Sequence, residues 1–146
     1  MIRRYKDRDK KELLALLKLN IPQYFASSEE SDFVEYLDNY VEDYFVVEDG
    51  GSIIGSGGLN YFPDDAIARI SWDIIHPDHQ GKGIGRQLVQ HRLELLQNNP
   101  EVNTAVVRTT QLVYRFYEKM GFMLVKTKKD FWAKGFDLYQ MHMYLK

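Results

Sequence analysis

The stretch that decides the fold of this chain is HPDHQGKGIGRQL, residues 76–88. The apolar residues 70–75 before it predict a strand, and leucines at helical spacing after it predict a helix. Glycines at positions 81, 83 and 85 free the backbone to turn successive N–H groups toward an anion. The following helix adds its unpaired N-terminal donors and the positive end of its dipole. With Lys82 and Arg86 as nearby charges, the stretch predicts a turn that binds a pyrophosphate.

The composition predicts one ordinary globular domain. The chain has 146 residues, 45% of them hydrophobic, a net charge of −2 and no cysteine. This length favours a single domain over residues 1–146. The charge argues against nucleic acid as a partner, and the absence of cysteine excludes disulfides, thiolate catalysis and cysteine-based zinc sites. No apolar run approaches the roughly 18 residues of a membrane span, and the basic N-terminus has no apolar run behind it. We therefore expect no membrane association, no metal and a cytoplasmic location.

The order of the predicted elements indicates a β-rich α/β fold. The residues Asp49-Gly50 between two apolar runs predict a hairpin turn, and Gly121 is typical of a helix end. The predicted helices cover residues 9–19, 28–41, 84–100 and 112–119. The predicted strands cover residues 44–48, 52–59, 69–75, 103–108, 122–127 and 138–145.

The glycine spacing excludes two common nucleotide sites. A P-loop needs an earlier glycine and a Ser or Thr after the lysine, and this chain has neither. A dinucleotide fingerprint would need a glycine at position 86, where Arg86 stands. The pattern Gln80-x-x-Gly83-x-Gly85 instead resembles the acyl-CoA signature of the GCN5-related N-acetyltransferase (GNAT) superfamily. A second block, Phe116-Tyr117-Glu118-Lys119-Met120-Gly121-Phe122, resembles that family's Phe-Tyr-Glu-Lys-x-Gly-Phe helix ending and lies at the expected distance.

The resemblance implies a fold and a donor. It predicts a mixed, mostly antiparallel central sheet flanked by helices, with two splayed strands that form the acyl-CoA site. Acetyl-CoA is then the donor substrate, and main-chain groups of Ile74 and Ile75 would pair with its pantetheine. The turn residues that would hold the pyrophosphate are Gln80, Gly81, Lys82, Gly83, Ile84, Gly85 and Arg86. The alternative is a solvated turn that only connects two elements.

The resemblance also suggests catalytic residues. Tyr117 matches the tyrosine that serves many members as the general acid, and a phenol with a pKa near 10 is protonated at neutral pH. Its alternative role is packing beside Phe116 and Phe122. Strict strand alternation would place Arg69, Ser71 and Asp73 on one face. Many relatives carry Glu or His at one of the first two positions, so Asp73 is the remaining candidate base, with a structural carboxylate as the alternative.

The acceptor class stays open at this point. Seven acidic residues on the second helix would attract a cationic amine, whereas Arg69 favours an acceptor with a carboxylate. We expect an N-acetyltransferase that acts on a primary amine of a small molecule or peptide, and a homodimer because relatives are often dimers. The alternatives are a non-catalytic acyl-CoA sensor on the same fold and a small α/β module that binds another phosphorylated ligand.

Overall fold

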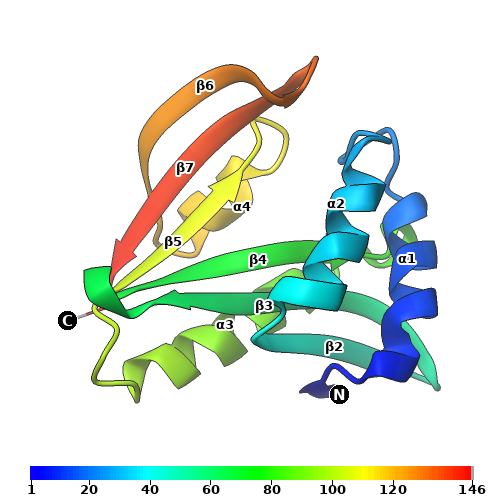
Figure 1. The fold of residues 1–146 in the computed structure, drawn as a ribbon, viewed down its shortest axis with the longest axis horizontal. Coiled ribbons are helices and arrows are strands. Elements are labelled where there is room, and N and C mark those ends of the chain that lie inside the picture. The colour runs from blue at the N-terminus through cyan, green and yellow to red at the C-terminus, as the bar shows by residue number, and fades with distance from the viewer. Residues whose placement is uncertain (146) are drawn as a thin grey trace.

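A computed structural model describes residues 1–145 of the chain as one seven-stranded sheet with helices on both faces (Figure 1). The strand order is β1-β2-β3-β4-β5-β7-β6. Every neighbouring pair is antiparallel except β4 and β5, which are parallel. The strands are β1 (Ile2–Arg4), β2 (Asp43–Asp49), β3 (Ser52–Phe62), β4 (Ile67–Ile75), β5 (Thr104–Thr109), β6 (Met123–Ala133) and β7 (Phe136–Tyr144).

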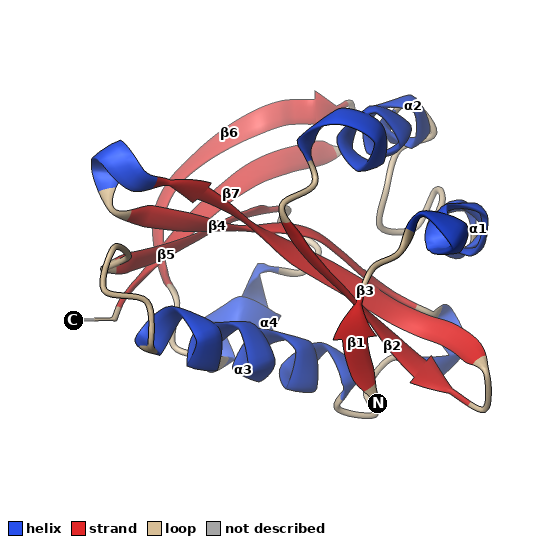
Figure 2. Cartoon of the chain, turned by 60° about the horizontal axis from the view of Figure 1, so that its bottom comes forward, coloured by secondary structure: helices blue, strands red, loops and turns tan. Residues whose placement is uncertain are grey.

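The helices form a layer on each face of the sheet (Figure 2). On one face lie α1 (Lys10–Lys18) and α2 (Glu29–Glu35), and α2 continues into a π-helical turn at Tyr36–Tyr40. On the other face lie α3 (Ile84–Gln97) and α4 (Tyr114–Lys119). Three short 3-10 turns complete the structure, at Asp7–Asp9, Pro63–Asp65 and Pro77–His79.

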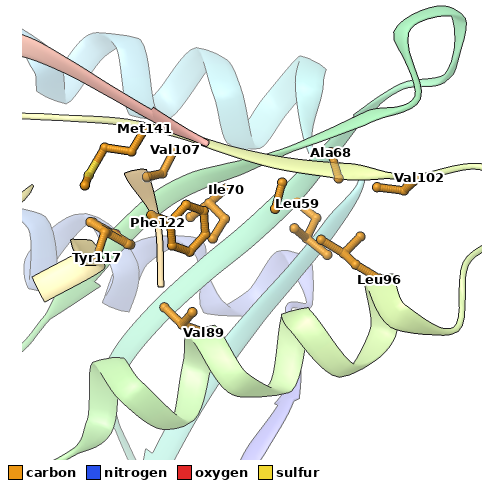
Figure 3. Packing of buried hydrophobic residues seen from close by; sticks show 11 residues of the cluster. Leu59, Ala68, Ile70, Val89, Leu96, Val102, Val107, Tyr117, Phe122 and Met141 are labelled. Atoms are coloured by element: carbon orange, nitrogen blue, oxygen red, sulfur yellow. The ribbon is translucent and has the colours of Figure 1, made fainter. Parts of the chain in front are cut away.

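Each helical layer covers its own apolar core. Beneath α3 and α4, the helix residues Val89, Leu96 and Tyr117 pack on sheet residues that include Leu59 and Ile70 (Figure 3). Beneath α1 and α2, residues such as Leu13, Leu17 and Phe33 pack on the opposite face of the same strands. Burial on two faces explains the apolar run Tyr44–Val47 of β2 and the buried stretch 53–59 of β3, since both sides of these segments are covered.

The strands β4 and β5 separate after a short paired segment. Their parallel pairing runs from Ile67 with Thr104 to Ile70 with Val107. Beyond those residues β4 continues to Ile75 and β5 to Thr109 without pairing to each other. The mixed sheet with splayed central strands is therefore confirmed.

A bulge in β4 corrects one prediction about side-chain direction. Gly58 of β3 pairs with Ser71 and Ser56 pairs with Ile74, so β4 contains one extra residue. The extra residue is accommodated at Trp72, whose φ of 49° lies in the left-handed region that bulky residues rarely adopt. The alternation of faces consequently breaks at Trp72. The prediction that Asp73 shares a face with Arg69 and Ser71 is wrong, because the bulge turns Asp73 toward α3 and α4.

Two strand predictions were incomplete. The strand β1 was not predicted because its three residues include two arginines, and it joins the sheet edge by pairing with β2. The strand β6 runs to Ala133, well past the predicted end at residue 127. Its added residues include Lys128, Lys129 and Asp130, which are exposed. Because these side chains are polar, this part of the strand lacks the apolar pattern that predicts a strand.

Candidate active site

A cavity of about 850 Å³ lies along β4, where β4 and β5 separate. Its wall is formed by residues of α2, β3, β4, the glycine turn, β5, α4 and β6. One end reaches the glycine turn and the start of α3, and the other reaches Arg69 and the aromatic residues around it. The cavity therefore connects the predicted phosphate-binding turn with the predicted catalytic tyrosine, Tyr117.

The glycine turn has the geometry of an anion site. Gly81 and Gly83 have φ values of 76° and 85°, and Gly83 directly precedes α3. The first N–H group bonded within this helix is that of Gln87, which donates to the carbonyl of Gly83. The amides of residues 84–86 precede that bond and point out of the N-terminal end of the helix, where they would donate hydrogen bonds to a bound anion.

Gly85 is needed for a different reason. It belongs to the first turn of α3, and a Cβ atom at this position would lie 3.2 Å from the ring of Phe116. That ring also lines the cavity and contacts Tyr117 edge-on, with 5.0 Å between the ring centroids. The second glycine of the predicted signature thus lets the turn pack against the helix that carries the candidate acid.

The predicted donor-binding residues do not all face the cavity. Those that line it are Ile75, Gln80, Gly81, Gly83, Ile84, Gly85 and Arg86. The Ile74 side chain is buried in the core beneath α1 instead, and Lys82 lies in a shallower groove with Glu48 and Asp49. The N–H of His76 donates to Ile54 of β3, so the main chain of Ile75 points the other way, into the split. Ile75 is therefore better placed than Ile74 to pair with a bound arm.

Asp73 and Tyr117 meet in a buried network that also contains Arg92. The Arg92 guanidinium donates two hydrogen bonds to the Asp73 carboxylate, at 2.6 and 3.0 Å, and the Tyr117 hydroxyl donates a third at 2.6 Å. Arg92 is 0% exposed and Tyr117 is 4% exposed. Arg92 is also held by the carbonyls of Leu88 and Gly58. Both catalytic candidates are thus fixed in one orientation.

The network sets the protonation state of Tyr117. Burial raises the pKa of this phenol well above 10, and the negative charge of Asp73 raises the pKa further. Tyr117 therefore carries its proton throughout the neutral range, as a general acid must. The Asp73 carboxylate, in contrast, already accepts three hydrogen bonds, two from Arg92 and one from Tyr117.

Two residues of the site, Asn60 in the cavity wall and Arg92 buried behind Asp73, were not placed there from the sequence. Asn60 accepts hydrogen bonds from the hydroxyls of Tyr36 and Ser71, at 2.9 and 2.6 Å, although these residues come from three different elements. Arg92 had a detectable signal, because it shares the apolar stripe of α3 with Leu88 and Leu96. A lone charge on such a stripe indicates a buried partner.

The comparisons with known proteins identify the family. A family model described as an acetyltransferase (GNAT) domain matches residues 41–124. The chain belongs to the GNAT acetyltransferase family. An amino-acid acetyltransferase of Actinobacillus pleuropneumoniae is 27% identical over 93 residues, which are 64% of this chain and 21% of that protein. An N-alpha-acetyltransferase of Sulfurisphaera tokodaii is 26% identical, over 84% of this chain and 77% of that protein.

Solved GNAT structures share the fold. A crystal structure of an aminoglycoside 6'-N-acetyltransferase complexed with coenzyme A superposes with a TM-score of 0.78 at 16% identity, over 100% of this chain and 97% of that one. The chain spans only about a fifth of the amino-acid acetyltransferase of Actinobacillus. The structural likeness thus establishes the fold, the family model establishes the family, and the reaction has to be argued from the site.

Two further findings concern membrane-spanning helices and metal ions. No helix within residues 1–145 has the length and apolar character to cross a membrane. Within the same residues, no group of three or more His, Asp or Glu side chains is arranged to hold a metal ion.

Proposed function

We propose that this protein is an N-acetyltransferase that moves the acetyl group of acetyl-CoA to a primary amine by direct attack. The observation that carries the proposal is the continuous cavity, which joins an anion-binding turn through the β4–β5 split to a protonated tyrosine. A donor bound with its pyrophosphate at residues 81–86 would extend its pantetheine arm along the unpaired edge of β4. Its thioester would then lie near Tyr117.

The donor is held mainly by backbone. The amides of the glycine turn and the first turn of α3 would bind the pyrophosphate, with Gln80 ordering the turn and Arg86 and Lys82 adding charge. Ile75 would pair with the pantetheine as a neighbouring strand would, because its main-chain groups point into the split. This arrangement places the thioester beside the acceptor and removes most of the entropic barrier to their reaction.

The reaction follows from the groups around the split. The amine nitrogen attacks the thioester carbonyl, the new C–N bond forms, and main-chain N–H groups would stabilise the oxyanion. The C–S bond then breaks, and the leaving thiolate takes the proton of Tyr117. The amine loses one proton to a base or to water, and Tyr117 regains its proton from water, so the proton balance closes. We propose that Asp73, held by Arg92, acts chiefly by orienting Tyr117, and the base role expected for it stays a prediction.

The test is release of free thiol from acetyl-CoA in the presence of a panel of amines. The panel contains amino acids, peptides, polyamines and aminoglycosides, and thermal stabilisation by acetyl-CoA is measured in parallel. We expect stabilisation by acetyl-CoA and amine-dependent thiol release. Stabilisation without release from any amine would overturn catalysis and support the acyl-CoA sensor. Equal stabilisation by acetyl-CoA and simple nucleotides would overturn the donor itself. The cytoplasmic location and the homodimer remain predictions.

A further inference from the structure

Two arginines at the acceptor end of the cavity have no anionic partner. Arg69 of β4 and Arg108 of β5 both line the cavity. Within residues 1–145, neither guanidinium forms an ion pair or donates a hydrogen bond, and the buried Nε of Arg69 has no partner at all. Arg92, by comparison, is fully paired. A half-buried cation without a counter-ion is costly, which makes a ligand the natural partner.

The two guanidiniums act on each other and are held in place by aromatic rings. Burial lowers the pKa of Arg69, and repulsion from the nearby positive charge of Arg108 lowers it further. Arg69 lies over the ring of Phe62, at 4.6 Å from its centroid, and Arg108 over Phe131 at 5.0 Å. Trp132 also stacks on Arg108 and is itself fixed by a hydrogen bond to Thr109. These contacts orient the guanidiniums without neutralising them.

The position of this pair excludes the pyrophosphate of the donor as its ligand. Ile75 lies six positions after Arg69 in β4, which corresponds to at most about 20 Å of strand. The glycine turn lies beyond Ile75, so the two anion sites are at opposite ends of the cavity. Ser71, two residues from Arg69 on the same face, lies close to the bulge where the thioester would sit. The arginine pair therefore faces the acceptor.

Resting on the proposed function, we propose that Arg69 and Arg108 bind a carboxylate of the acceptor, which makes the substrate an amino acid or a peptide that carries a carboxylate near the reacting amine. Guanidinium groups bind carboxylates with paired hydrogen bonds, and two of them would hold one carboxylate in a fixed direction. A polyamine would leave both cations unpaired.

The opposite wall of the cavity complements this assignment. It carries four carboxylate side chains, those of Glu29, Asp32, Glu35 and Glu42. Positive charge on the β4–β5 side and negative charge on the α2 side match a molecule with both an amine and a carboxylate. A zwitterionic acceptor would thus bind with its carboxylate on the arginines and its amine toward the acidic wall.

The test compares acceptors that differ only in the carboxylate. Each L-amino acid and dipeptide in a thiol-release assay is paired with its C-terminal amide, glutamate and aspartate are also paired with glutamine and asparagine, and diamines complete the panel. For the best acceptor, conversion to the amide should lower kcat/KM roughly 10- to 100-fold, as for the loss of a hydrogen bond to a charged group. Arg69→Gln and Arg108→Gln should cause the same loss for the carboxylate and almost none for the amide.

Two control variants separate the alternatives. Arg115→Gln removes the same charge from an exposed position outside the cavity and should change nothing. Arg86→Gln should raise the KM for acetyl-CoA, whereas the two acceptor-end variants should leave it unchanged. Equal turnover of amides or diamines, or an Arg69→Gln effect on the KM of acetyl-CoA, would overturn the carboxylate site while leaving the acetyltransferase intact. Failure of every amine to release thiol would overturn the proposed function and this inference with it.

Discussion

The two ends of the cavity along β4 differ in the groups that line them, which are main-chain amides at one end and side chains at the other. The proposed donor end consists of main-chain amides from one continuous segment, with two glycines in left-handed conformations. The acceptor end consists of side chains that α2, β3, β4, β5 and β6 bring together. A main-chain site depends on glycine spacing and tolerates many side chains. A side-chain site changes with each substitution, so one fold can keep its donor while its acceptors differ.

The largest expected effect is at the donor end. Gly83→Asp places a side chain at a φ of 85° and a carboxylate where the pyrophosphate would lie, so acetyl-CoA affinity should fall more than about 100-fold. Titration calorimetry measures this directly. Gly51→Asp is the matched control, because Gly51 has a φ of 83° and equally open surroundings in the β2–β3 turn. Equal losses in both variants would mean that strain, and not the anion site, causes the effect.

The second effect is at the junction of the two ends. Tyr117→Phe should lower kcat about 100-fold with little change in acetyl-CoA affinity, because the leaving thiolate loses its proton donor. Since the pKa of Tyr117 is raised above 10, its protonated form persists there, and kcat of the unmodified enzyme should not fall between pH 7 and pH 10 through this group. Tyr114→Phe, on the same helix, should be nearly silent. A larger loss from Tyr114→Phe would move the acid role to that residue.

Asp73→Asn distinguishes a base from a positioning residue. If Asp73 orients Tyr117, the Asp73→Asn variant should lose about tenfold in kcat. Its kcat/KM should still fall at low pH as it does in the unmodified enzyme. The melting temperature should also drop, because Arg92 would be left buried without its anion. If kcat/KM of the variant no longer fell at low pH, Asp73 would instead have the base role predicted from the sequence.

The smallest effect is at the acidic wall of the acceptor end. Burial raises the pKa of Glu29 above its usual 4.5, so the folded state disfavours the charged form, and stability falls as the pH rises through that region. Glu29→Gln should therefore stabilise the protein at pH 7, by up to about 1 kcal/mol, and have no effect below pH 4. Thermal melts at both pH values test this, with the exposed Glu35→Gln on the same helix as the control. A loss of stability at pH 7 would contradict the burial argument.

The sequence predicted the glycine turn and its place before α3 far better than the residues at the other end of the cavity. Glycine spacing between a strand and a helix is a local pattern, and the residues 116–122 confirmed its register, so the fold and most cavity-lining turn residues were predictable. The β4 bulge was not, because nothing in the residues 69–75 marks Trp72 as an extra residue, and it moved Asp73 to the other face. Asn60, Arg108 and Trp132 join the site only through strand pairing, which no single segment reveals.

The most direct test of the donor site is amide hydrogen exchange with and without acetyl-CoA. Slower exchange is predicted at residues 81–86 and at Ile75, whose main-chain groups point into the split. The β2–β3 turn at Gly50 and Gly51 should exchange at the same rate in both states. Unchanged exchange at residues 81–86, or protection confined to other segments, would contradict the assignment of the glycine turn and the split strands to the donor.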